Sequence, residues 1–233
     1  MAKSGRQEQV VRLVKAVSDS AKSNGESRVG GSEAAIADLL VWLNHLEKSE
    51  VTGCCNETLS GIRAAAVEAA GGVALGLVRL AIFAMRSQID LAVSWLFFKD
   101  HPVEWAHVLR TGEQFKLKKE IFSYLSDYQD RFLERLALLE KHKTRTVADP
   151  YRLLSAHIHS QSTLVMPTFS KLESLVYPEK RCLEAIKLQK EVTEYIGDIF
   201  FACFGSKWAS LPSSLVTAAK ARIPPDKQPI IFS

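Results

Sequence analysis

The short motifs that mark the common nucleotide-binding and hydrolytic enzymes are missing from this sequence. There is no Gly-x-x-x-x-Gly-Lys-Ser/Thr loop, no Gly-x-Gly-x-x-Gly after a strand, no His-Glu-x-x-His and no Gly-x-Ser-x-Gly. The one glycine-rich stretch, residues 71–76, sits inside an apolar run with helical spacing. Its glycines therefore indicate close helix packing rather than a phosphate-binding loop.

Cysteine is scarce and unsuitably spaced for metal binding. The chain has four cysteines, at Cys54, Cys55, Cys182 and Cys203. Adjacent Cys54 and Cys55 cannot readily bridge to each other, and no Cys-x-x-Cys or Cys/His cluster has the spacing of metal ligands. We therefore expect free thiols in a reducing cytoplasm, and no metal or other cofactor.

An excess of one charge and a membrane-spanning run are also lacking. Lys and Arg number 30 against 26 Asp and Glu, a net charge of +4 that permits contact with RNA without requiring it. The N-terminus has no signal-peptide apolar stretch. The most apolar segment, residues 69–85, is about 17 residues long and contains Arg79, so it predicts a buried core helix and no stable membrane insertion.

What the sequence does contain is helical periodicity along most of its length, with no strong strand signal. The predicted helices are residues 6–22, one beginning at Ser32, 58–99 (one helix, or two joined near Gly71-Gly72), a short helix from Pro102, 113–141, 150–159, 178–204 and 213–222. This pattern predicts an all-α fold: a single helical bundle of about six to eight helices around a long central hydrophobic helix.

Three regions are expected along the chain. Residues 1–31 are predicted to be an N-terminal helix and a flexible linker, because residues 23–31 are rich in Gly and Ser. Residues 32–222 form the predicted bundle. Residues 223–233 contain Pro224, Pro225 and Pro229 and are predicted to be an extended Pro-rich tail that is available for docking.

The segment that carries candidate chemistry follows Asp149-Pro150, a strong helix-start signal. In a helix, Arg152 and His159 return to within about 20° of the same face, about 10 Å apart along the axis. Ser155 lies between them on the same stripe and Tyr151 is close to it, whereas His157 points about 140° away from Arg152.

Such a set of side chains suits chemistry on a phosphodiester. A neutral imidazole can exchange a proton near physiological pH, and a guanidinium can clamp a phosphate and stabilise its developing charge. Cleavage of RNA by its own 2′-hydroxyl needs no metal. The alternative is that Arg152 pairs with a nearby carboxylate and that His157 and His159 are satisfied core or interface groups.

The stretch Arg152-Leu153-Leu154-Ser155-Ala156-His157-Ile158-His159 resembles the Arg-x4–6-His motif of the HEPN superfamily of helical-bundle proteins. Many HEPN members are metal-independent ribonucleases of RNA processing, toxin–antitoxin and antiviral systems, in which two copies meet to form one active site. Residues 86–90 are similar to the helix that supplies a supporting polar residue there. The resemblance implies Arg152, His159, His157 and Ser155 as catalytic residues, supported by Arg86, Asp90 and Tyr151.

Two functions follow as expectations. The first is a HEPN-like endoribonuclease that cleaves RNA as a homodimer, as a toxin or antiviral-defence effector. The alternative is a non-catalytic subunit of a defence complex that binds a nucleotide, a partner protein or an antitoxin, because Leu153 is apolar where the active ribonucleases usually carry a polar residue. Basic residues near the ends of the predicted 113–141 helix are either a solvated face or an RNA-guiding surface: Lys116, Lys118, Lys119, Lys141, His142, Lys143 and Arg145.

Overall fold

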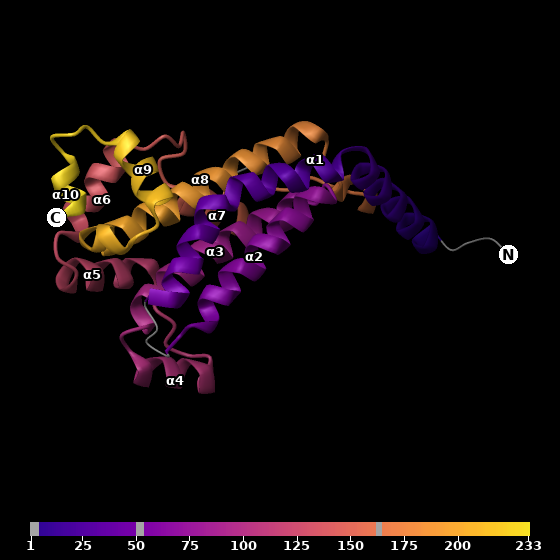
Figure 1. Ribbon diagram of the computed structural model, residues 1–233. Coiled ribbons are helices and arrows are strands. Elements are labelled where there is room, and N and C mark those ends of the chain that lie inside the picture. The colour runs from indigo at the N-terminus through magenta and orange to yellow at the C-terminus, as the bar shows by residue number, and fades with distance from the viewer. Residues whose placement is uncertain (1–4, 50–53, 162–164) are drawn as a thin grey trace. The chain divides into compact units, whose positions relative to one another are not determined.

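Helices account for the regular structure of the protein (Figure 1). The computed structural model describes residues 5–49, 54–161 and 165–233, and within these ranges there is no strand. The α-helices are α1 (Gly5–Ser49), α2 (Glu57–Ala74), α3 (Val78–Phe98), α4 (Pro102–Thr111), α5 (Lys118–Tyr128), α6 (Phe132–Lys141), α7 (Pro150–Ile158), α8 (Glu179–Phe204), α9 (Ser213–Arg222) and α10 (Gln228–Phe232), and the short 3-10 helices are η1 (Leu172–Leu175) and η2 (Gly205–Ser210). The predicted all-α bundle is confirmed.

Helix α3 is the predicted hydrophobic core helix. Among the described residues it alone has the length and composition of a membrane span, and 67% of that stretch is buried inside the fold. Ala81, Met85 and Ile89 follow one another at helical spacing and are fully buried. An apolar stripe that is covered by protein in this way is the mark of a core helix.

The chain divides into two compact units, each made of three stretches of sequence. The described residues of the first unit fall within Met1–Ile36, Ala64–Ser87 and Asp149–Val192. Those of the second fall within Ala37–Arg63, Gln88–Ala148 and Thr193–Ser233. The units are therefore discontinuous in sequence, and the predicted division into residues 1–31, 32–222 and 223–233 does not describe them.

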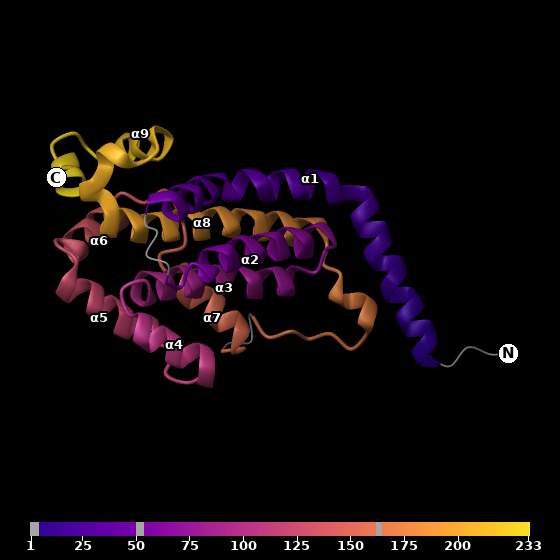
Figure 2. The ribbon, with the colours of Figure 1, turned by 60° about the horizontal axis from the view of Figure 1, so that its bottom comes forward.

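In the first unit, α1 lies against α2 and α8 (Figure 2). A Cβ on Gly25 would lie 3.5 Å from the carbonyl oxygen of Ala74, and one on Gly31 would lie 3.2 Å from Ile186. The Arg28 side chain, 2% exposed, donates to Glu179 through Nε at 2.9 Å and to the carbonyl of Ala74 at 3.3 Å. Residues 23–31 are thus a packed part of α1.

The flexible linker predicted over residues 23–31 is therefore wrong. Glycine and serine were interpreted as chain breakers, but here the missing side chains of Gly25 and Gly31 allow neighbouring helices to approach closely. The guanidinium of Arg28 also stabilises the C-terminal end of α2, where carbonyl groups lack helical partners.

The apolar region predicted over residues 58–99 is two helices joined by a tight turn at Gly76. Gly76 has φ +80°, a left-handed conformation that side chains disfavour. Its carbonyl accepts a hydrogen bond from the Tyr177 N–H at 2.8 Å. A Cβ there would lie 2.8 Å from Ser20 Oγ and 2.9 Å from Val176 Cγ1. Gly76 therefore joins three segments of the first unit.

Aromatic side chains form much of the core of the second unit. The ring of Trp42 on α1 lies 5.5 Å from that of Phe200 and 4.8 Å from that of Phe201, both on α8. Trp95 on α3 contacts Phe200 and Phe204 at centroid distances of 6.3 and 6.1 Å. Edge-to-face and tilted pairs of this kind are favourable arrangements for aromatic rings.

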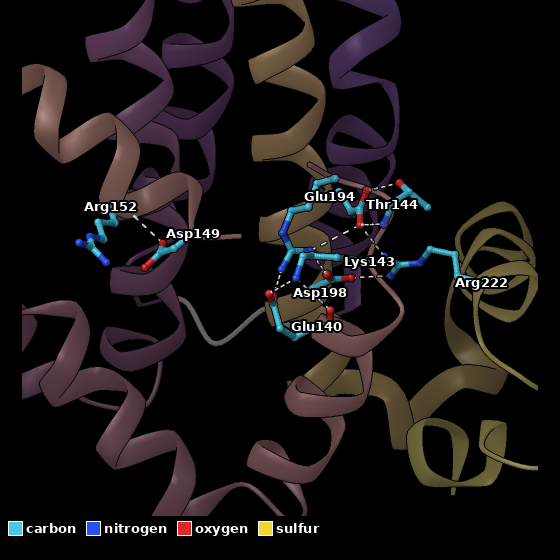
Figure 3. Close-up of polar contacts among 9 residues, drawn as sticks. Glu140, Lys143, Thr144, Asp149, Arg152, Glu194, Asp198 and Arg222 are labelled. Carbon is cyan, nitrogen blue, oxygen red and sulfur yellow. Dashed lines mark hydrogen bonds and ion pairs between the residues drawn. The ribbon is translucent and has the colours of Figure 1, made fainter. Parts of the chain in front are cut away.

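A network of charged side chains in the second unit surrounds the buried carboxylate of Asp198 (Figure 3). Asp198 accepts from Arg145 and Arg222, each at 2.5 Å, and the Arg145 and Asp198 side chains are both 1% exposed. Arg222 also pairs with Glu194 at 2.9 Å, and Glu140 pairs with Arg145. Burial raises the pKa of Asp198, although both guanidinium groups oppose that shift. These contacts fix the loop before α7 to α8 and α9.

The helix predicted over residues 113–141 is broken into α5 and α6. Arg131 adopts φ +55° and begins α6, so that Phe132 turns back to meet Phe122 at a centroid distance of 5.7 Å. The amphipathic pattern continues through the break and gave no indication of it. This break and α10 raise the number of described α-helices to ten, above the predicted six to eight.

The extended tail predicted over residues 223–233 is also wrong. Ile223 and Ile231 are buried, and residues 228–232 form α10 with a proline in its first turn, where no N–H is needed. Buried Arg135 donates to the carbonyls of Ile230 and Ser233, at 3.3 and 2.9 Å. Ile223, Ile231 and the guanidinium of Arg135 therefore hold residues 223–233 in place, although the proline content of this segment predicted an extended tail.

We expect Gly76→Ala to lower the free energy of unfolding by about 2–4 kcal/mol, because the new Cβ meets both a strained φ and two close neighbours. Gly71→Ala is the matched control: no atom lies within 4 Å of its Cβ and the site is helical. That change should be neutral or stabilising by about 0.5–1 kcal/mol. Urea unfolding of both variants measures the difference, and equal stabilities would contradict the assignment of Gly76.

We expect Asp198→Ala to destabilise the fold by about 3–5 kcal/mol, because it leaves the buried guanidinium of Arg145 without the carboxylate that is buried with it. Asp226→Asn, which removes a carboxylate from an exposed pair with Lys227, should change stability by no more than about 1 kcal/mol. Thermal and urea unfolding report both values. A small effect of Asp198→Ala would show that the network is dispensable.

Candidate functional site

The candidate site is built on α7, and the sequence predicted the start of this helix correctly. The Asp149 carboxylate accepts a hydrogen bond from the backbone N–H of Arg152 at 3.1 Å, and Pro150 occupies the first turn. The helix ends at Ile158, and the N–H of His159 donates to the Ser155 carbonyl at 2.9 Å. His159 therefore stands at the C-terminal cap of a nine-residue helix.

Arg152 and His159 are both exposed. In Figure 3, Asp149 is joined to the backbone of Arg152, and the guanidinium of Arg152 extends away from it. Within the described residues, that guanidinium forms no ion pair. The described residues therefore do not support the alternative in which a carboxylate of the same chain neutralises Arg152.

Arg86 on α3 contacts two further predicted residues of α7. Its Nε donates to Ser155 Oγ at 3.0 Å, and its guanidinium lies over the Tyr151 ring, 3.6 Å from the centroid. Tyr151 and Ser155 are four residues apart and so share one face of the helix. The structure thus brings Arg86, Ser155 and Tyr151 together, with Arg86 docking α7 by a hydrogen bond and a cation–π contact.

Arg79, one heptad before Arg86 on α3, holds the other end of α7. It donates to the carbonyl of His157 at 3.0 Å, to Ser160 Oγ at 3.4 Å and to the carbonyl of Val165 at 3.4 Å. A cation at the C-terminal end of a helix interacts favourably with the helix dipole. Because Arg79 meets the end of α7 and Arg86 meets its first turns, the two helices run antiparallel.

Sequence reasoning treated Arg79 only as an obstacle to a membrane span and did not predict its contact with α7. A signal was present, because a guanidinium inside an apolar stretch of sequence must find hydrogen-bond acceptors when that stretch is buried. The partners could not be named, since they lie 78 to 86 positions further along the chain.

The two histidines differ in their surroundings. His157 is half-buried, and burial together with the charges of Arg79 and Arg181 lowers its pKa. Its imidazole is therefore neutral at neutral pH. His159 is exposed at the end of α7, on the stripe that also contains Ser155 and Arg152. Of the two imidazoles, only that of His159 shares both the predicted face and the exposure of Arg152.

The remaining predicted groups belong to the second unit. Asp90 is half-buried on the part of α3 that belongs to the second unit. Several cations of the predicted basic surface are engaged within the second unit: Lys116 pairs with Glu104, Lys143 with Glu140, and Arg145 with Asp198. Lys119 and Lys141 are exposed. Ion pairs within the chain therefore account for much of that surface.

No family model, curated protein or solved structure matches this chain. The resemblance of α7 to the HEPN motif consequently stays a prediction that rests on Arg152, Ser155, His157 and His159.

We expect Arg86→Ala to loosen α7, because it removes a charge-assisted hydrogen bond to Ser155 and the cation–π contact with Tyr151. Protection of the α7 amides against hydrogen exchange should fall on the order of tenfold. Arg152→Ala, which removes an exposed guanidinium from the same helix, should leave that protection unchanged. Equal protection in both variants would mean that Arg86 does not hold the helix.

Proposed function

We propose that this protein is a HEPN-like, metal-independent endoribonuclease that acts as a homodimer, as a toxin or antiviral-defence effector in the cytoplasm. The observation that carries the proposal is the exposure of Arg152 on α7 and of His159 at its C-terminal cap, with α7 held against α3 by Arg79 and Arg86. A clamped helix keeps a guanidinium and an imidazole at a fixed separation, which a phosphodiester reaction requires.

The distribution of charge supports an anionic substrate. The first unit, which contains α7, has 14 Lys and Arg against 10 Asp and Glu, and the second has 16 against 16, which together make the 30 and 26 of the chain. The entire net charge of +4 therefore belongs to the unit that carries the candidate site. Positive potential of this kind attracts a polyanion such as RNA.

In the proposed reaction, His159 takes the proton of a ribose 2′-hydroxyl, which attacks the adjacent phosphorus. Arg152 stabilises the negative charge that builds on the non-bridging oxygens. The bond to the 5′-oxygen breaks, and that oxygen receives a proton from the equivalent imidazole of a second copy. The products are a 2′,3′-cyclic phosphate and a 5′-hydroxyl, and no oxidant, metal or cofactor takes part.

A second candidate function is a protein-binding subunit without catalysis, and an exposed apolar face favours it. Val10, Val11 and Val14 on the first turns of α1 are 51%, 49% and 62% exposed. Apolar side chains spaced along one exposed helix suit a groove on a partner protein. The docking role suggested for residues 223–233 loses its basis, because Ile231 is buried.

We expect the purified protein to cleave single-stranded RNA in the presence of EDTA. Arg152→Ala and His159→Ala should each lower the cleavage rate by about 10²–10⁴-fold, the usual contribution of proton transfer or of one charge-stabilising donor. Lys22→Ala, an exposed cation of α1 in the same unit, is the control and should cleave at the normal rate.

The same assay separates the alternatives. A loss of cleavage in His157→Ala but not in His159→Ala would move the proton-transfer role to the half-buried imidazole. Cleavage that persists in both Arg152→Ala and His159→Ala would end the proposal. Absence of cleavage, together with a stable complex with a partner protein that Val10→Asp and Val14→Asp abolish, would establish the binding function instead.

A further inference from the structure

The first turns of α1 extend beyond the helices that pack on it in the first unit. The end of α2 meets α1 at Gly25, where an added Cβ would lie 3.5 Å from the carbonyl oxygen of Ala74. The start of α8 meets α1 at Arg28, which pairs with Glu179 at 2.5 Å. Residues 5–22 of α1 lie past both points, as Figure 2 shows. The described parts of α2 and α8 therefore end where this part of α1 begins.

An apolar stripe runs along these turns in the register of the buried residues that follow. Four residues, which we call the N-terminal stripe, lie within about 60° of one another on the helix: Val10, Val14, Val17 and Ala21. Arg28 and Ala35 follow Ala21 at intervals of seven residues, and both are buried. Val10 and Val14 are instead more than half exposed. The buried face of α1 thus continues past the helices that cover it.

An ion pair turns the opposite face of these turns toward the fold. The Nε of Arg12 lies 3.5 Å from a carboxylate oxygen of Glu173 on η1. On a helix, Arg12 points about 160° away from both Val10 and Val14. The N-terminal stripe therefore faces away from η1, which explains why its valines are exposed.

The side of the helix that carries the stripe is uncharged. All the charged residues between positions 7 and 22 lie more than about 100° from the middle of the stripe: Glu8, Arg12, Lys15, Asp19 and Lys22. Two of them, Lys15 and Asp19, pair with each other at 2.6 Å. This charged side is only weakly basic, whereas helices that lie on membrane surfaces are rich in Lys and Arg there. A protein partner therefore fits the stripe better than a membrane.

The residues that border the stripe indicate which protein that partner is. Paired helices select or reject one another through charges beside the apolar seam. In this chain those positions are Val11, Leu13, Ser18 and Ser20. They carry no charge, so two identical helices meet here without repulsion. A two-fold interface places one patch against itself, and a continuous row of small apolar side chains is complementary to its own copy.

We propose that the N-terminal stripe binds the same stripe of a second copy of this chain, so that two α1 helices pair along it. Four turns from each copy bury on the order of 1,000 Å² in total, the lower limit for a specific interface. The dimer therefore dissociates in the micromolar range. The contact supplies the second copy that the proposed reaction requires, and only that link to catalysis rests on the proposed function.

The test measures the mass of the whole protein by sedimentation equilibrium from about 1 to 100 μM, without RNA, a range that brackets a weak interface. Val14→Asp should weaken the dimer at least about hundredfold, because it places two like charges in the seam. Val67→Asp, the same change at a 70% exposed valine of α2, is the matched control and should leave the dimer unchanged. High salt should not weaken an uncharged seam.

A cysteine variant tests the same contact without a charge that could disturb folding. Val14 lies near the middle of the stripe, so a second copy opposes it whether the two helices run parallel or antiparallel. With oxidised glutathione, Val14→Cys should form an intermolecular disulfide: two thiols lose their protons and are oxidised, and one glutathione disulfide is reduced to two thiols. Val67→Cys should stay a single chain on a non-reducing gel.

A mass that stays at one chain throughout the concentration range would overturn this contact, and so would a dimer that Val14→Asp and Val67→Asp weaken equally. A single chain that binds vesicles of anionic lipid, or a different protein, through Val14 would also overturn it. A dimer that only Val14→Asp dissociates would support the contact even if the protein cleaves no RNA. Failure of the dimer contact and failure of the proposed nuclease are therefore distinguishable.

Discussion

A buried guanidinium must find acceptors for its hydrogen bonds, and this requirement organises the protein. Arg28 joins α1 to the end of α2 and to α8, while Arg79 and Arg86 join α3 to α7. In the second unit, Arg135 holds the C-terminal residues and Arg145 holds the loop before α7 against α8. Each contact links segments that are distant in sequence, and breaking it would leave a buried or half-buried charge without its hydrogen bonds.

All of these arginines except Arg145 belong to helices that also carry buried apolar side chains. Apolar burial supplies most of the driving force for folding but is non-directional, so it does not by itself specify the register of one helix against another. Hydrogen bonds from a planar guanidinium are directional. Arg79 and Arg86 both contact α7, one at its end and one at its first turns, and together they define its position along α3.

Sequence signals correctly predicted the features that depend only on interactions between neighbouring residues. Asp149-Pro150 and Pro102 marked helix starts correctly, because capping and proline geometry act within one turn. The break at Arg131 and the helical course of residues 23–31 depend on distant partners, such as the pairing of Arg28 with Glu179. The composition of residues 23–31 favoured a linker, and only the close neighbours of Gly25 and Gly31 in the structure show that this segment is packed helix.

The same difference between local and long-range interactions explains how much of the candidate site could be predicted. Helical geometry alone indicated that Arg152, Ser155 and His159 share a stripe with Tyr151 close to it, and the resemblance added Arg86 and Asp90. The contacts of Arg86 with Ser155 and Tyr151 then place those three groups together. The role of Arg79 lay beyond sequence reasoning, because its acceptors are backbone carbonyls, which any residue type can supply. The residue types in the sequence therefore do not indicate such a contact.

The length of α7 has a consequence for how temperature affects the protein. A helix of nine residues is shorter than those that persist alone in water, so α7 depends on its docking against α3 for its helical state. Warming that releases this small element returns it to coil and scatters Arg152 and His159 while the larger helices stay folded. Any activity that needs both side chains would thus fade below the melting temperature of the bundle.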